Sequence, residues 1–253
     1  MRSVLVLMLV LVLPLAGCLD ASSRPGDLPL HDALLLSDPY PVLIVEIDHV
    51  EGLEPHPDAL AAVREALETY TEKEQVIFLG PQAIPAQGDA HTPDGLKRIH
   101  RLTADLAPTA PGVHGRDGVA FLHVLYLDGQ LERQGEPSHA AGTQFDAHGL
   151  LVVFPETFRD AHRILDGRSV AVDGDVERVV LLHELGHSLG LVDDGIPTLR
   201  PHGGGGHSTN PQSVMYPRVP ITEDGLVQRA LPRGFDADDQ ADLRAYVAAH
   251  SLG

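Results

Sequence analysis

Apolar and polar residues alternate along the chain in short blocks that predict both strands and helices. Four brief runs rich in β-branched and aliphatic residues predict strands at residues 42–47, 75–79, 119–127 and 149–154. Apolar positions that recur every three or four residues predict helices at residues 57–70, 93–106, 175–189 and 238–251. Gly80-Pro81 is expected to end the second strand. Strands that alternate with helices are typical of a layered α/β or α+β domain.

The N-terminal residues differ from the rest of the chain. Arg2 precedes an apolar run at residues 4–15, whereas a membrane-spanning helix needs roughly 20 such residues, so the run predicts a secretory signal peptide at residues 1–17. The run ends in Leu15-Ala16-Gly17-Cys18, which resembles the lipobox of prokaryotic lipoproteins. The resemblance implies cleavage before Cys18, lipidation of its thiol, and an extracytoplasmic protein anchored to the membrane by lipid. A plain secretory signal is the alternative.

The balance of charge and the single cysteine limit the partners of the chain. The chain has 18 Lys and Arg residues against 36 Asp and Glu, a formal net charge of −18. This argues against nucleic acid, because a phosphate backbone requires a basic face. One cysteine permits neither an intramolecular disulfide nor a Cys-rich zinc cluster. The length of 253 residues suits one domain, which we expect to be monomeric, with residues 18–40 as a tether before it.

The helix predicted at residues 175–189 carries the candidate chemistry. It is apolar almost all round, so it is expected to be buried. Its segment His183-Glu184-Leu185-Gly186-His187 places two imidazoles one helical turn apart, where they can hold one Zn²⁺. Glu184 would take a proton from the zinc-bound water and pass it to the leaving amine. The alternative is two core histidines beside a capping or salt-bridged glutamate.

The residues after this helix extend the pattern. Gly190 follows His187 by three residues, where a left-handed glycine can end the helix. Further along comes Ser213-Val214-Met215-Tyr216-Pro217, in which Met215 is the only methionine beyond the predicted signal peptide. Together these residues resemble the metzincin clan of zinc endopeptidases, with the matrixins and archaemetzincins as the most similar groups. The resemblance is specific over residues 180–217.

The resemblance implies a fold and a division of the chain. The implied fold is the α+β zincin fold, in which a mixed twisted sheet packs on the active-site helix. Residues 41–190 would form an upper lobe, and residues 191–253 a small lower lobe that contains the Met-turn at Met215 and is closed by a C-terminal helix. The strand at residues 149–154 resembles the edge strand of the clan, which pairs with an extended substrate.

The third zinc ligand has two candidates. In most metzincins it follows the second histidine by six residues, a position occupied here by Asp193. In matrixins and archaemetzincins it precedes the methionine of the turn by eight residues, which is His207. We favour His207 over Asp193, with His202 a weaker candidate; residues 193–206 are then an insertion whose flexible Gly203–Gly206 run returns His207 to the metal. A catalytic site needs three protein ligands and one open position.

These residues predict a zinc-dependent endopeptidase that acts on protein or peptide substrates with one catalytic Zn²⁺. Two alternatives remain: a non-catalytic, zinc-stabilised binding lipoprotein, and a zinc hydrolase of a non-peptide amide. Asp173 and Asp175 could contact Ca²⁺, but two carboxylates are too few to support a calcium site. Other histidines lack ligand spacing and are expected on the surface or in loops, namely His91, His114, His123, His139, His148 and His162.

Overall fold

The structure is a computed structural model in which residues 12–14, 28–138, 140–165, 168–222 and 225–251 are described. Cys18 lies outside these residues, as does the predicted signal peptide apart from its residues 12–14. Those three residues form β1 (Val12–Pro14), which pairs antiparallel with β15 (Arg218–Pro220). Within the described part of the chain, no helix is long and apolar enough to cross a membrane.

Five α-helices occur in the described residues, and four of them match predicted helices. They are α1 (Leu30–Leu35), α2 (Pro57–Tyr70), α3 (Pro93–Thr103), α4 (Asp173–Ser188) and α5 (Ala237–His250). Side-chain caps mark where three of them begin, and at α2 the His56 Nδ1 accepts a hydrogen bond from the Asp58 N–H. The Thr92 hydroxyl accepts a hydrogen bond from the Gly95 N–H at the start of α3, and Asp236 and Asp239 form a reciprocal capping box at α5.

Helix α1 corrects the expectation that residues 18–40 are a tether. Its Leu30, Leu34 and Leu35 side chains are buried in the main core, and the Tyr246 hydroxyl of α5 donates a hydrogen bond to Asp32. Residues 30–35 therefore belong to the folded domain. A helix this short is stabilised by tertiary packing, and it is too short to display a clear apolar period in the sequence.

The main sheet is mixed and has six strands. Five of them lie in the order β3 (Gln75–Ile84), β2 (Val42–Val50), β6 (Val119–Tyr126), β10 (Leu150–Val153) and β9 (Gly142–Phe145). The first four strands run parallel, whereas β9 is antiparallel to β10, and β5 (Gly115–Arg116) pairs antiparallel with β6. Helices α2 and α3 lie in the connections between parallel strands, as parallel pairing requires. The domain thus combines helices with a mixed sheet and is compatible with the predicted α+β class.

Two strand predictions are wrong in detail. Strand β3 continues through Gly80-Pro81 to Ile84, because a register shift opposite Glu46 and Asp48 of β2 accommodates the interruption. The strand predicted at residues 149–154 is not an edge strand, since β10 lies between β6 and β9. The last strand in that direction is β9, whose four residues are too few and too mixed in polarity to predict a strand.

Nine further strands in the described residues form small sheets and hairpins around the main sheet. The three-stranded sheet consists of β4 (Ala90–His91), β7 (Gln130–Arg133) and β8 (Glu136–Ser138). Two hairpins are built from β11 (His162–Leu165) with β12 (Arg168–Ala171), and β13 (Gly203–Gly204) with β14 (His207–Ser208). The remaining pair is β1 with β15. The hairpin of β13 and β14 carries one of the candidate ligands.

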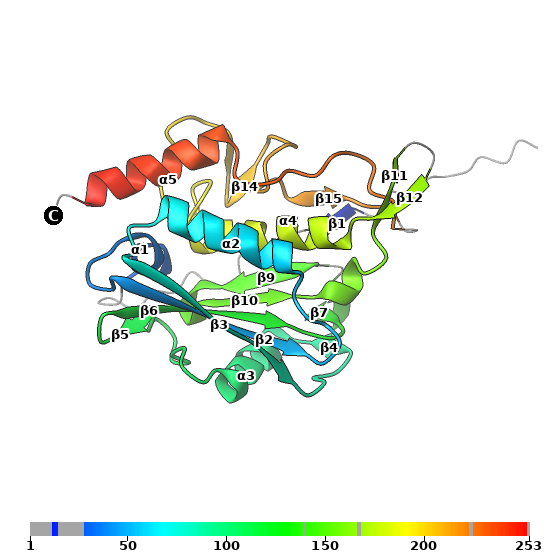
Figure 1. The fold of residues 1–253 in the computed structure, drawn as a ribbon, viewed down its shortest axis with the longest axis horizontal. Coiled ribbons are helices and arrows are strands. Elements are labelled where there is room, and N and C mark those ends of the chain that lie inside the picture. Colours follow the sequence, from blue (N-terminus) through cyan, green and yellow to red (C-terminus); the bar gives the residue numbers. More distant parts are fainter. Residues whose placement is uncertain (1–11, 15–27, 139, 166–167, 223–224, 252–253) are drawn as a thin grey trace, which may run out of the picture.

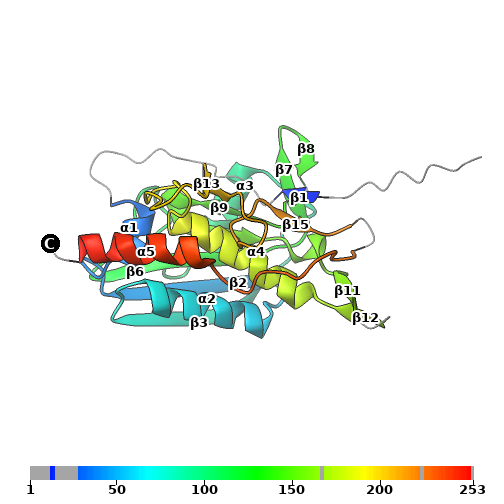
Figure 2. The ribbon, with the colours of Figure 1, turned by 90° about the horizontal axis from the view of Figure 1, so that it is seen from above.

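Helices cover both faces of the main sheet (Figure 1). Helices α2 and α4 pack side by side on one face, where the larger apolar core includes Leu122 and Val124 of β6. Helix α3 covers the other face over a second core, which includes Leu125 and Phe145. Helix α5 lies beside α2 in both views (Figure 2). This layering places α4 in the interior, and all its residues from Val179 to Ser188 are buried.

Candidate metal centre

Three histidines come together between α4 and β14. His183 and His187 project from successive turns of α4, and His207 begins β14. One nitrogen from each ring can be chosen such that all three lie within 4.8 Å of one another. The ring centroids are 4.6 to 5.3 Å apart. The structure thus brings His207 to the two helix histidines and forms a group that can bind a metal ion.

Hydrogen bonds fix which nitrogen each ring presents. His183 Nδ1 donates to the Val214 carbonyl at 2.8 Å, and His207 Nδ1 donates to the Gly205 carbonyl at 3.2 Å. His187 Nδ1 donates to Asp194 Oδ2 at 3.0 Å. Carbonyl and carboxylate oxygens only accept, so the proton of each neutral ring lies on Nδ1. The three Nε2 atoms therefore carry the lone pairs that bind metals.

The separation of two of these atoms tests whether a cation fits the centre. His183 Nε2 and His187 Nε2 are 3.0 Å apart. Two lone pairs that face each other at this distance repel, unless a proton or a metal cation lies between them. Burial, and secondarily the neighbouring His187, lower the pKa of His183 well below its ordinary value, which disfavours the proton. The donor set therefore fits a cation with nitrogen ligands, for which Zn²⁺ is well suited.

Glu184 lies inside the same region without a hydrogen-bond partner among the described residues. The side chain is fully buried, and neither carboxylate oxygen makes a hydrogen bond. Burial raises the pKa of Glu184 well above its ordinary value; the positive charge of Arg133 opposes this shift and the negative charge of Asp146 adds to it. An unsatisfied buried carboxyl is costly to a fold, so its presence points to a chemical role.

Strand β9 approaches this carboxylate closely. A Cβ atom at Gly142 would lie 2.9 Å from Glu184 Cγ and 2.9 Å from Val180 Cγ1, so this position has no room for a side chain. Burial, and then the charge of Asp194, raise the pKa of Asp146 to about 7. Sequence reasoning missed Arg133, Gly142 and Asp146, because only folding brings them to Glu184 and no local spacing signals it.

The turn at Met215 lies directly beneath α4. The Met215 side chain is fully buried, and a Cβ atom at Gly186 would lie 2.3 Å from Met215 Sδ. Position 186 thus has to be glycine for the Met215 turn to approach α4 this closely. The Ser208 N–H donates to the Met215 carbonyl at 2.9 Å, which connects the turn to the strand that carries His207.

The loop between α4 and His207 is held by specific bonds. Gly205 and Gly206 have φ values of +60° and +79° and form the two-residue turn of the β13–β14 hairpin. The glycine run expected to be flexible is therefore an ordered turn. Asp194 binds His187, as described above, whereas Asp193 accepts hydrogen bonds from the Thr198 N–H and hydroxyl at 3.1 and 3.2 Å. Asp193 is exposed and does not belong to the three-histidine group.

Helix α5 fixes the loop and the turn together. His202 Nε2 donates to Asp242 Oδ2 at 2.8 Å, so this weaker ligand candidate is used in a structural contact. The Ser213 hydroxyl donates to Asp239 Oδ2 at 2.8 Å and accepts the Met215 N–H at 2.9 Å. Both aspartates are buried. The C-terminal helix thus positions the segments on both sides of His207.

The expectation that the remaining histidines lie on the surface or in loops is wrong for His91 and His123, which are buried in strands β4 and β6. His123 is fully buried; its Nε2 donates to Asp48 Oδ2 at 2.9 Å, and its Nδ1 lies 2.7 Å from His100 Nδ1. Strand β6 is an interior strand, so a polar residue at its centre is buried whatever its type. Other buried members of the set are His91, His114 and His148. His162 is half-buried, and His139 lies outside the described residues.

No second metal-binding group is evident in the residues that the structure describes. Three or more ligating side chains with such close ligand atoms occur only at the three histidines. Asp175 pairs with Arg178 at 2.6 Å, and Asp173 lies in the first turn of α4. These contacts are those expected of acidic residues at a helix N-terminus. The two aspartates therefore give no support to a calcium site.

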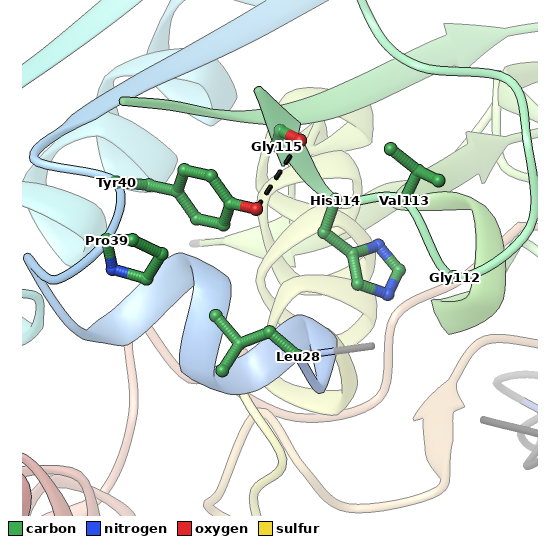
Figure 3. Close-up of a pocket in the computed structure, with 7 residues that line it drawn as sticks. All are labelled: Leu28, Pro39, Tyr40, Gly112, Val113, His114 and Gly115. Atoms are coloured by element: carbon green, nitrogen blue, oxygen red, sulfur yellow. Dashed lines mark hydrogen bonds between the residues drawn. The ribbon is translucent and has the colours of Figure 1, made fainter. Parts of the chain in front are cut away.

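A pocket of about 300 Å³ lies away from the three histidines (Figure 3). The Tyr40 ring and the His114 imidazole face into it, and the Tyr40 hydroxyl donates to the Gly115 carbonyl at 3.4 Å. The lining residues are Leu28, Pro39, Tyr40, Gly112, Val113, His114 and Gly115. None of them is a carboxylate or a thiol, so the pocket offers no cluster of catalytic groups.

Comparison with known proteins adds no family to this geometry. No protein-family model matches the chain, and no curated protein sequence matches it. The resemblance noted above therefore rests on the residues of α4 and the Met215 turn alone.

Proposed function

We propose that the protein is a zinc-dependent endopeptidase of the metzincin type. The observation that carries this proposal is the convergence of three histidine Nε2 atoms beside Glu184, a buried carboxylate without a hydrogen-bond partner among the described residues. A structural zinc site has no use for a base at this position and is commonly closed by four protein ligands. Here the group comprises three side chains, and Asp193 is bound to Thr198 instead.

The surrounding architecture supports the same class. The mixed sheet, the buried helix α4, the methionine turn beneath it and the closing helix α5 agree with what the resemblance implies. Strand β9, and not the strand predicted at residues 149–154, is the last strand of the main sheet on this side.

The residues divide the chemistry between them. His183, His187 and His207 would hold the zinc ion, which supplies Lewis acidity to the scissile carbonyl and lowers the pKa of water. Glu184 accepts a proton from the attacking water and donates it to the nitrogen of the leaving amine. A carboxyl whose pKa is raised by burial is a competent proton carrier, because it takes the proton from water more readily than an exposed carboxylate does and can still pass it to the amine, which is the stronger base. Asp194 keeps the His187 ring in the orientation that presents Nε2.

Cleavage of a mixed peptide library by the mature chain tests this function. Glu184→Gln is expected to lower cleavage by roughly 10²–10⁴-fold while one zinc remains bound per chain. Glu177→Gln is the matched control, because Glu177 is a buried glutamate on the same helix that bonds instead to Tyr126 and the His56 N–H. Retained turnover in Glu184→Gln would overturn the mechanism. Absence of cleavage by zinc-loaded wild type would favour the binding lipoprotein, and turnover of small amides alone would favour the non-peptide hydrolase.

We further propose that the enzyme is an extracytoplasmic lipoprotein attached through Cys18. The lipobox at residues 15–18 supports this location, and the acidic net charge offers little attraction to anionic lipid over the surface as a whole. Cys18→Ser is expected to move the mature protein from the membrane fraction to the soluble fraction. An unchanged distribution would contradict lipid attachment.

A further inference from the structure

The hairpin of β11 and β12 lies at one end of the molecule, away from the body of the main sheet (Figures 1 and 2). It presents apolar side chains to solvent. Ile164, Leu165 and Val170 are 55%, 45% and 42% exposed. Single exposed apolar residues are ordinary on protein surfaces. This short hairpin carries three, of which Leu165 and Val170 share one face and Ile164 lies on the other, so it presents more apolar surface than a single exposed residue does.

The base of this hairpin is fixed to the body of the protein. Ala161 and Val172, which flank the two strands, are buried and joined by a hydrogen bond of 2.9 Å. The His162 N–H donates to the Gly225 carbonyl at 2.9 Å, and the His162 carbonyl accepts the Val227 N–H at 2.7 Å. The hairpin is therefore anchored to the segment that follows the Met215 turn. Its exposed side chains are presented by a rigid base.

The same hairpin differs from the rest of the chain in charge. Residues 159–171 contain three arginines and two aspartates, whereas the whole chain has a net charge of −18. Arg163 lies opposite Val170 and Arg168 lies opposite Leu165, so one face of the hairpin alternates arginine with aliphatic side chains. Ile164 lies opposite Ser169 on the other face. A face that combines arginine with aliphatic side chains is complementary to a partner that has an apolar interior and anionic groups at its surface.

We propose that this hairpin docks into the interface of a lipid bilayer that carries anionic headgroups. Leu165, Val170 and Ile164 enter the boundary between headgroups and acyl chains, while Arg163 and Arg168 extend to the phosphates. A protein partner is disfavoured, because three exposed apolar residues are far fewer than the roughly 20–30 residues that a stable protein interface uses on each side.

This inference goes beyond the proposed peptidase function and gives the enzyme an orientation. Nine residues lie between Cys18 and Leu28, so a lipid on Cys18 would limit the distance of the domain from the membrane without selecting which end faces it. A second contact through the hairpin fixes which end of the molecule faces the bilayer. The hairpin is bonded to residues 225 and 227, which follow the Met215 turn. The side of the domain that carries this segment would therefore face the membrane.

The absence of tryptophan from the chain permits a site-specific test. In the full chain carrying Cys18→Ser, a single tryptophan is introduced as Leu165→Trp or Val170→Trp in the hairpin. Leu102→Trp is the matched control, because Leu102 is exposed on α3. Emission is recorded with vesicles of phosphatidylcholine and phosphatidylglycerol, and with the same vesicles containing brominated phosphatidylcholine as a quencher.

The hairpin variants are expected to show a blue shift and quenching with these vesicles, whereas Leu102→Trp shows neither. Adding Arg163→Gln and Arg168→Gln to Leu165→Trp is expected to weaken binding and to remove its dependence on salt. Unchanged emission in both hairpin variants, or equal shifts in the α3 control, would overturn the proposal. A blue shift that appears without vesicles and grows with protein concentration would assign the hairpin to contact between two copies and would also overturn it.

Discussion

Two groups of histidines lie on opposite faces of the main sheet, and they use their nitrogens differently. On the face covered by α4, His183, His187 and His207 each bond through Nδ1 to an oxygen of the protein and converge through Nε2. On the face covered by α3, His100 and His123 bond to each other, and His123 bonds to Asp48. Both groups are close clusters of imidazoles, but only the first directs its lone pairs to a common point.

The difference teaches that the partner of each ring's second nitrogen decides what a histidine cluster can bind. A carbonyl or carboxylate on Nδ1 sets the tautomer and turns Nε2 outward as a ligand. Where the acceptor is another imidazole, the ring nitrogens satisfy each other and no shared lone-pair site remains. The number of histidines, or their proximity alone, does not make this distinction.

The largest expected difference is in zinc binding, when one imidazole ring is removed from each group of histidines in turn. His207→Ala should abolish peptide cleavage and weaken zinc binding by more than roughly 100-fold, because a ligand is lost rather than a residue that only supports one. His100→Phe should keep one zinc per chain, since His100 lies in the other group. Zinc content after dialysis against a weak chelator measures both. Equal zinc loss in the two variants would contradict the assignment of the metal to α4.

A second contrast lies in the acid stability of the chelator-treated protein. Burial, with help from His123 and His148, lowers the pKa of His100 from 6.5 to about 3. Between these values the unfolded chain binds a proton that the folded chain does not, so stability falls as the pH falls through this range. The slope from one such proton is about 1.4 kcal/mol per pH unit.

Urea unfolding at several pH values compares wild type with His100→Phe. The variant lacks the titrating ring, so its stability should decline less steeply below pH 6.5. Curves that remain parallel across this range would show that His100 does not account for the pH dependence.

A smaller effect is expected from the aspartate that orients His187. Asp194→Asn should weaken zinc binding by roughly 10–100-fold, because the bond that holds the ring loses its charge. Asp193→Asn is the matched control, since Asp193 bonds to Thr198 and not to a ligand histidine. Asparagine also tolerates the φ of +61° at this position. Competition titration with a zinc-binding dye measures both affinities. If Asp193→Asn had the greater effect, Asp193 rather than His207 would deserve the role of third ligand.

The smallest effect is expected from the glycine turn that returns His207. Gly206→Ala places an L-residue at a φ of +79°, with its Cβ 2.6 Å from His187 Cε1. The left-handed conformation costs about 1–2 kcal/mol, and the contact adds to it. Gly204→Ala meets nothing within 4 Å and should be nearly neutral. Thermal unfolding of the zinc-free proteins separates the two, and equal stability would show that the turn is not strained by a side chain.

Much of the local structure could be predicted because it depends on neighbouring residues. The apolar period of residues 57–70 predicts α2 with the bounds observed. The spacing of His183 and His187 alone places both rings on one side of α4, because an α-helix has 3.6 residues per turn. The glycine at position 190, with a φ of +78°, follows the end of α4 as predicted.

Tertiary structure decided what distant segments bring to the site. The sequence alone left His207 and Asp193 as alternatives, and the β13–β14 hairpin together with the α5 contacts selects His207 as the neighbour of α4. The same holds for β9 beside Glu184 and for the burial of His123 in an interior strand. Sequence spacing determines directions along one element, whereas the approach of separate elements depends on how the whole core packs and which backbone groups remain to be paired.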